Sequence, residues 1–118
     1  MATGLENLKI YNLSVRLEIF IYKVTEKFPK EEKFNSVSQL RRSCSSIPNN
    51  IAESYGRPSS KAKCQYLYVA VGEAEETRSG IDRAYKKGFI TEKMRNFIIE
   101  KYTELLKGIS SYVKFLKN

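Results

Sequence analysis

Apolar residues recur at alternating three- and four-residue steps in four separate stretches of the chain, and this repeat limits the fold more than any other sequence feature. Such spacing places apolar side chains on one face of an α-helix, whereas strand-type alternation extends nowhere beyond a few residues. The pattern predicts amphipathic helices over residues 7–28, 36–56, 60–87 and 91–117. Because the linkers between them are short, we expect an all-α, up-down-up-down four-helix bundle.

Each predicted helix has one apolar seam that should face the bundle core. In the third helix the seam meets Arg78, so we expect the buried stripe to pass through Thr77 there. The seams are Ile10, Ser14, Leu17, Ile21, Val24 and Phe28; Val37, Leu40, Cys44, Ile47, Ile51 and Ser54; Cys64, Leu67, Val71, Ala74, Ile81 and Tyr85; and Ile98, Tyr102, Leu105, Ile109, Tyr112 and Leu116.

Residues that break or cap helices mark the predicted helix ends. Pro29 ends the first helix, because proline disfavours the helical conformation in the residue before it. Ser36 opens the second helix with Gln39 three residues later, which predicts a capping box. The other signals are Gly56 after the second helix, Ser59 and Ser60 before the third, Gly88 after it, and Thr91 as N-cap of the fourth.

Length and composition exclude several classes of site. The chain has 118 residues, which predicts a single domain over residues 1–118. It contains no histidine, so nucleophiles paired with histidine and histidine-ligated metal sites are excluded. Cys44 and Cys64 lack the Cys-x-x-Cys spacing of a metal or redox site, and we expect them to be reduced core thiols. The sequence predicts no catalytic residue, metal or cofactor.

No stretch of the sequence has the uninterrupted apolar length that a bilayer span requires. The first eleven residues also lack the apolar core of a signal peptide. We therefore expect a cytoplasmic protein that makes no contact with a membrane.

The net charge is +8, from 21 Lys and Arg against 13 Asp and Glu, and the excess is spread along the whole sequence. A basic protein attracts polyanions, since Lys and Arg that neutralise phosphates release counterions. The charge therefore indicates RNA or DNA as a partner. The alternative is a bundle whose lysines are simply solvated.

The first and fourth predicted helices carry more apolar residues than one bundle face needs. The excess includes Ile19 and Phe20 in the first helix and Phe97 and Phe115 in the fourth. Apolar surface outside the core favours contact with other subunits, so we expect a homo-oligomer. The alternative is a monomer with singly exposed apolar side chains.

A proline lies inside the second predicted helix. Pro48 has no N–H to bond the carbonyl of Cys44, which costs roughly 3 kcal/mol in an ordinary helix. We expect Ser43, Ser45 and Ser46 to bond freed carbonyls, with a kink that lets the helix wrap its neighbours.

Arg41, Arg42 and Arg57 flank this polar segment. They suit either phosphate binding or an ion pair with Glu53 of a neighbouring helix or subunit. A rise of 1.5 Å per residue separates Arg41 from Arg57 by roughly 24 Å, which favours two separate contacts with a polymer. The predicted nucleic-acid-binding residues are Arg41, Arg42, Arg57, Lys61 and Lys63.

The sequence resembles the small four-helix-bundle proteins encoded within intervening sequences of bacterial 23S ribosomal RNA genes. The markers are residues 28–32, 39–42 and 46–53, then Gly56-Arg57, and Gly72 with Glu76. Within them, Ser46, Pro48, Asn50, Glu53 and Gly56 form the structural motif of the second helix.

This resemblance implies a left-handed bundle, a ring-like homopentamer and no known catalytic activity. It also implies kinship with the accessory variability determinant of diversity-generating retroelements, a basic pentameric bundle that binds nucleic acid and a reverse transcriptase.

Three functions are weighed on these grounds. The first is a non-enzymatic oligomeric bundle that associates with RNA or DNA. The second is a structural or adaptor protein that binds a protein partner such as a reverse transcriptase. The third, an enzyme, has only Glu73, Glu75 and Glu76 in its favour, and carboxylates without a pocket or partner set specify no reaction.

Overall fold

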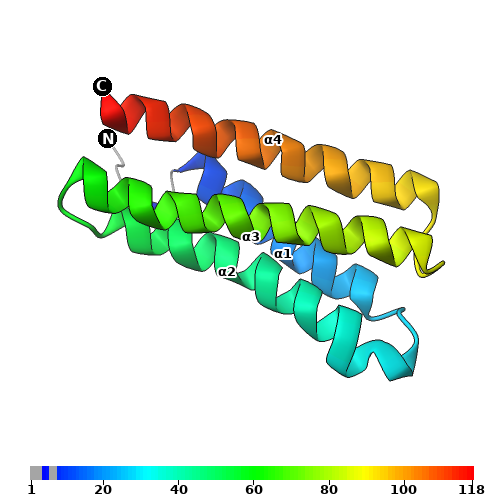
Figure 1. The fold of residues 1–118 in the computed structure, drawn as a ribbon. Helices are drawn as coiled ribbons and strands as arrows, with labels where there is room; N and C mark the ends of the chain where they lie inside the picture. The colour runs from blue at the N-terminus through cyan, green and yellow to red at the C-terminus, as the bar shows by residue number, and fades with distance from the viewer. Residues whose placement is uncertain (1–3, 6–7) are drawn as a thin grey trace.

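Four helices make up the fold in the computed structural model, which describes residues 4–5 and 8–118. They are α1 (Lys9–Thr25), α2 (Ser38–Tyr55), α3 (Ser60–Lys86) and α4 (Glu92–Lys117), and the described residues contain no strand. Consecutive helices run antiparallel in an elongated bundle of 44 × 25 × 24 Å (Figure 1). The prediction of an all-α four-helix bundle is confirmed.

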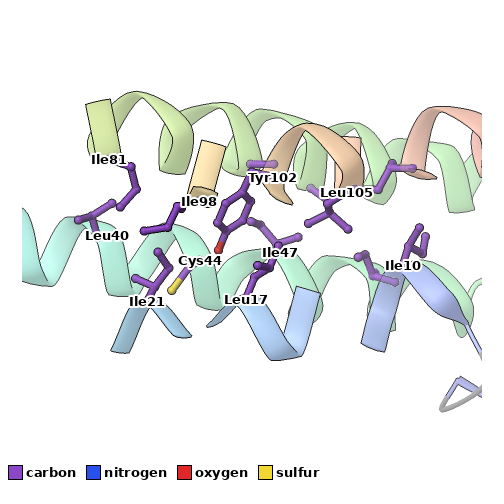
Figure 2. Packing of buried hydrophobic residues seen from close by; sticks show 14 of the residues in the cluster. Ile10, Leu17, Ile21, Leu40, Cys44, Ile47, Ile81, Ile98, Tyr102 and Leu105 are labelled. Atoms are coloured by element: carbon purple, nitrogen blue, oxygen red, sulfur yellow. The ribbon is translucent and has the colours of Figure 1, made fainter. Parts of the chain in front are cut away.

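The core follows most of the predicted seams (Figure 2). Five seam residues are only half-buried, namely Val24, Val71, Tyr85, Tyr112 and Leu116. Residues buried outside the seams include Thr25, Ala70, Ala84 and Val113. All six seam residues of the predicted second helix are buried, and α2 and α3 pack together most extensively.

In α3 the buried stripe passes through Thr77, as expected. The Thr77 hydroxyl lies 2.8 Å from the Ser43 hydroxyl. Tyr102 of α4 is fully buried, and its hydroxyl has no hydrogen-bond partner among the described residues. The core is thus continuous across all four helices.

The first helix ends at Thr25, so the expected end at Phe28 was wrong; its expected start at Asn7 lies outside the described residues. The Thr25 hydroxyl donates to the Ile21 carbonyl at 2.8 Å. The amides of Lys27 and Phe28 then bond carbonyls only three residues back, which tightens the chain into turns before Pro29. Phe28 remains buried, which explains why it fitted the seam.

The start of the second helix also differs from the sequence expectation. Two short helical turns, η2 (Lys30–Glu32) and η3 (Lys33–Val37), precede α2, and η3 is a π-helix. The prediction of a capping box from Ser36 to Gln39 is wrong, because Ser36 is bonded to the carboxylate of Glu32. Glu32 accepts from the Ser36 hydroxyl at 2.5 Å and from its amide at 3.4 Å.

The remaining helix ends lie within one residue of their predicted places. Ser59 accepts from the Ala62 amide, and Thr91 accepts from the Met94 amide, each at 3.1 Å. At the end of α3, Gly88 has a φ of +83°. The Phe89 amide bonds the Ala84 carbonyl, and the Gly88 amide bonds the Tyr85 carbonyl. These two bonds form the Schellman motif.

Gly88→Ala should lower the free energy of unfolding by about 1 kcal/mol, because a side chain is strained at this positive φ. Gly72→Ala is the matched control in the same helix, where an added Cβ meets nothing within 4 Å. It should raise stability by roughly 0.5–1 kcal/mol through helix propensity. Urea denaturation of both variants checks the pair, and a loss at both positions would contradict the expectation.

The described residues include no helix long and apolar enough to cross a membrane. Burial raises the pKa of the Cys44 thiol to about 12, and both Cys44 and Cys64 are free and buried. The thiols thus sit in the core as expected from the sequence.

Candidate nucleic-acid interface

One end of the bundle has a high net positive charge. This basic end, defined as residues 22–41 and 80–95, is where α1 and α3 end and α2 and α4 begin (Figure 1). It contains ten Lys and Arg against five Asp and Glu, a net +5 of the chain's +8. Cations from two distant stretches of the sequence meet here, because antiparallel helices bring both connectors to one end.

The two connectors of the basic end are tied to each other. The rings of Phe28 and Phe89 lie 5.3 Å apart between centroids. The Lys87 ammonium donates to the Ser36 hydroxyl at 3.3 Å, which links the α3–α4 turn to η3. These contacts hold the two connectors, and the cations they carry, at the same end of the bundle.

Most cations of the basic end have no ion-pair partner within the described part of the chain. The exceptions are Lys86 and Arg95, which both bind Asp82. Seven exposed side chains have no carboxylate partner there: Lys23, Lys27, Lys30, Lys33, Arg83, Lys87 and Lys93. Of these, Arg83 donates to the Ser79 hydroxyl and Lys87 to the Ser36 hydroxyl.

Asp82 anchors α4 to α3 at this end. It accepts two hydrogen bonds from Arg95, at 2.7 and 3.0 Å, and its other oxygen lies 3.1 Å from Lys86. Hydrogen bonds from Arg95 and Lys86 lower the pKa of Asp82 below its ordinary value of 3.8. The carboxylate therefore stays charged and stabilises the folded state at neutral pH.

We expect the stabilisation from Asp82 to be complete above pH 3.8 and to disappear as the pH falls through its lower folded pKa. Asp82→Asn should thus be less stable than the parent at pH 7, and the difference should narrow below pH 3.8. Urea denaturation between pH 7 and pH 2 measures it. Arg95→Gln should produce the same narrowing, and a constant difference at all pH values would contradict the assignment.

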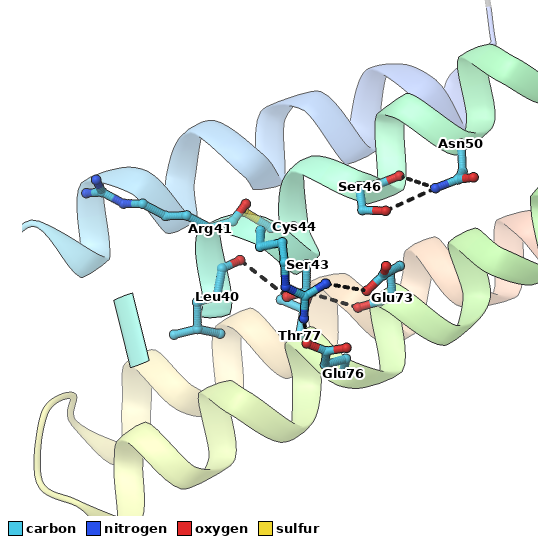
Figure 3. Close-up of polar contacts among 10 residues, drawn as sticks. Leu40, Arg41, Ser43, Cys44, Ser46, Asn50, Glu73, Glu76 and Thr77 are labelled. Carbon is cyan, nitrogen blue, oxygen red and sulfur yellow. Dashed lines mark hydrogen bonds and ion pairs between the residues drawn. The ribbon is translucent and has the colours of Figure 1, made fainter. Parts of the chain in front are cut away.

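Arg41 belongs to the basic end, but it is engaged with α1. Its guanidinium donates to the Thr25 hydroxyl at 3.0 Å and to the Tyr22 carbonyl at 3.1 Å, and lies 4.5 Å from the centre of the Tyr22 ring. Figure 3 shows it directed toward α1, away from Glu73 and Glu76. Arg41 therefore caps the C-terminal end of α1.

Arg42 lies on the side of α2 that faces α3. It forms an ion pair with Glu76, and a second of its nitrogens is 3.7 Å from Glu73. Glu75 pairs with Arg78 in the same way. The carboxylates weighed as enzyme candidates thus take part in surface ion pairs.

The other three predicted residues lie at the opposite end of the bundle. Arg57, just after the end of α2, pairs with Glu53 of the same chain segment, four residues before it and not on another helix. Its guanidinium lies 4.8 Å from the centre of the Tyr66 ring. Lys63 donates to the Tyr55 carbonyl at 2.9 Å and caps α2. Lys61 is exposed, with no partner described.

The motif of the second helix is structural in its contacts. The Asn50 amide donates to the Ser46 carbonyl at 2.8 Å and to the Ser46 hydroxyl at 3.0 Å (Figure 3). Pro48 is buried inside α2, which continues past it to Tyr55, and Gly56 is the C-cap. The motif therefore shapes α2 and lies away from the basic end.

The serines before Pro48 bond other groups than the carbonyl that Pro48 frees. Ser43 donates to the Leu40 carbonyl at 3.3 Å, and Ser45 lies 3.4 Å from the Tyr22 hydroxyl. The expectation that serines bond the carbonyl freed by Pro48 was wrong for Ser43 and Ser45, because their side chains face Thr77 of α3 and Tyr22 of α1. The Ser46 hydroxyl accepts from the Asn50 amide.

Other sites would need groups that the described residues do not bring together. No three His, Cys, Asp or Glu side chains within the described part of the chain are grouped to hold a metal ion.

A groove of about 580 Å³ lies between α1 and α4 at the basic end. Its lining is Phe20, Lys23, Val24, Glu26, Lys27, Phe89, Ile90, Thr91 and Met94.

Comparisons with known proteins agree with this architecture. A family model described as 23S rRNA-intervening sequence protein matches residues 6–111. Among solved structures, the chain is similar to a protein of unknown function from the S23 ribosomal protein family of Bacteroides thetaiotaomicron. The two share 26% identity over 89% of this chain and 95% of that one, with a TM-score of 0.82. The comparison with curated proteins gave no match.

Proposed function

This chain belongs to the 23S rRNA-intervening sequence protein family, and we propose that it is a non-enzymatic, oligomeric helical bundle that binds nucleic acid, either RNA or DNA. The observation that carries the proposal is the net charge of +5 at the basic end. Cations clustered on one surface bind phosphates and release counterions, whereas the same cations dispersed would bind weakly. We place this activity in the cytoplasm.

The contacts of the proposal fall into two groups. The principal contact is the basic end, to which Arg41 belongs, with the exposed lysines as phosphate ligands. Arg57, Lys61 and Lys63 form a second, weaker contact at the opposite end, because Arg57 and Lys63 are already bonded within the chain. Arg42, on the flank between them, would have to exchange Glu76 for a phosphate.

Binding measurements over a salt series test the proposal. A labelled 23S ribosomal RNA fragment and a duplex DNA of equal length are titrated with the protein from 50 to 500 mM salt. The logarithm of affinity should fall linearly with the logarithm of salt concentration, with a slope of about −0.7 to −0.9 per phosphate contact. If neither polymer binds at the lowest salt, the proposal is wrong and an adaptor function replaces it.

Assembly is the second part of the proposal, supported by apolar side chains on the outer faces of two helices. Ile19 of α1 is 52% exposed, and Phe97 and Phe115 of α4 are 47% and 73% exposed. We propose that these faces join copies of the chain, each a left-handed bundle, in the ring-like pentamer that the family resemblance implies. Five copies would carry a net charge of +40, five times the +8 of one chain.

Light scattering at micromolar concentration should therefore give a mass near 68 kDa, five times the 13.6 kDa of one chain. Ile19→Asp should shift that mass downward, since a carboxylate cannot be buried in an apolar contact without a partner. Val69→Asp on α3, at a similarly exposed position, is the matched control and should leave the mass unchanged. A wild-type mass of 13.6 kDa would end the oligomer proposal.

An adaptor that binds a protein partner, such as a reverse transcriptase, is the second candidate. The groove between α1 and α4 favours it, because its floor is apolar and its rim carries Lys23, Glu26 and Lys27. Binding to this groove would be disrupted by Met94→Asp, which leaves every lysine of the basic end in place. The two candidates are thus separable by variants.

A further inference from the structure

Phe34 is the most exposed large hydrophobic side chain among the described residues, at 82% of its surface. A single exposed apolar side chain is common in proteins, so exposure alone does not define a site. The surroundings of Phe34 distinguish it: the residue lies in η3, on the connector between α1 and α2, within the basic end.

The backbone that carries Phe34 is fixed on both sides. Ser36 and Val37, two and three residues later, are buried. Glu32, two residues earlier, accepts from the Ser36 hydroxyl at 2.5 Å, and Lys87 of the other connector donates to the same hydroxyl at 3.3 Å. The ring is therefore exposed to solvent on an ordered turn. A ligand can bind it with little loss of conformational entropy in the protein.

Charged residues precede Phe34 on the connector. Its one described contact is the Lys33 ammonium, 5.4 Å from the ring centre. Lys30 and Lys33 are exposed on the same connector, beside Glu31. A protein partner that buried Phe34 would have to desolvate these neighbours, whereas a nucleic-acid strand would place phosphates against the lysines.

We propose that Phe34 is a stacking platform for an unpaired base of single-stranded nucleic acid, with Lys30 and Lys33 contacting the adjacent phosphates. An exposed aromatic ring next to backbone-binding cations is the arrangement that holds single strands. In a duplex the bases are already stacked on one another and offer no free face. This inference rests on the proposed nucleic-acid binding and adds the class of ligand, namely unpaired RNA or DNA.

The chain has no tryptophan, so Phe34→Trp introduces a single tryptophan at the proposed platform, whose emission can be excited apart from that of the eight tyrosines. Unstructured RNA and DNA oligonucleotides of equal length should quench its emission when bound, and a hairpin duplex should quench it less. Equal quenching by the RNA and DNA arms indicates stacking on the base alone, and stronger quenching by RNA indicates an added contact with the 2′-hydroxyl. Absence of quenching by either bound strand would overturn the inference.

Phe34→Ala provides the affinity measurement. It should weaken binding of single strands about 5-fold to 100-fold, with no change for the duplex. The salt slope should stay the same, because no charge is removed. Tyr68→Ala is the matched control, since Tyr68 is an exposed aromatic with Lys117 5.9 Å from its ring centre on another part of the bundle. It should bind like the wild type.

The outcomes separate the two proposals. If the wild type binds neither single strands nor duplex in a salt-dependent manner, the proposed function itself fails. If the wild type binds and Phe34→Ala binds single strands equally well, the stacking platform is wrong while nucleic-acid binding stands. The same conclusion follows if Phe34→Ala weakens duplex and single strand alike. Circular dichroism of both variants verifies that the helices are intact.

Discussion

Replacing three lysines of the basic end by glutamate, as Lys27→Glu, Lys30→Glu and Lys33→Glu, should lower the affinity for nucleic acid by about 100-fold or more. Each phosphate contact contributes roughly a factor of ten near 0.1 M salt, because affinity scales with salt to about the power −0.9 per contact. The three side chains are exposed and form no ion pair within the described part of the chain, so the fold should tolerate the change. The salt slope should also become shallower by about three.

A control triple separates the basic end from net charge. Lys9→Glu, Lys107→Glu and Lys114→Glu also lower the net charge from +8 to +2, and all three positions are exposed outside the basic end. This triple should lose far less affinity than the first when both are titrated against the same RNA at the same salt. Equal losses would show that binding follows total charge and that the basic end is not the interface.

Ile47→Ala should lower the free energy of unfolding by about 2–5 kcal/mol, the largest stability effect we expect from one substitution. Ile47 is fully buried in α2, within the core cluster that contains Tyr102 and Leu17 (Figure 2). Truncation removes apolar contacts and leaves a cavity that fully packed neighbours can fill only in part. A domain of this size is stable by roughly 5–15 kcal/mol, so the loss is a large fraction of the total.

Urea denaturation at fixed protein concentration measures this effect, since the stability of an oligomer depends on concentration. Val69→Ala is the control, because Val69 on α3 is 48% exposed and does not belong to the core. It should change the stability by less than about 0.5 kcal/mol. Similar losses for Ile47→Ala and Val69→Ala would contradict the placement of the core.

Helix positions and buried faces were predictable from the sequence because they depend on near neighbours. Side chains three and four residues apart share a helix face, so the seam of α2 could be followed from Val37 to Ser54. Ser59 and Thr91 were recognisable as N-caps, because each bonds an amide only three residues away. The same local pattern gave a wrong N-cap at Ser36, because the Ser36 hydroxyl and amide both donate to the Glu32 carboxylate.

The candidate site was much less predictable, because its members come from distant parts of the chain. Arg41 and Arg42 are adjacent in sequence and yet bond α1 and α3 respectively, since neighbouring positions on a helix point about 100° apart. Lys27 and Lys93 were ordinary lysines at the ends of predicted helices. The up-down topology predicted from the sequence places both lysines at the same end of the bundle, and this would have grouped them.

The sequence by itself therefore determined the helical class, the buried seams and most helix ends, for which hydrogen bonds and packing contacts recur within a few residues. Only the tertiary structure decided which cations meet, which are already paired and which aromatic ring stays exposed. Those properties depend on which helix faces come together and on how the two connectors of the basic end fold over that end of the bundle. Electrostatic contacts of this kind join residues as far apart as Ser36 and Lys87, and no local spacing encodes them.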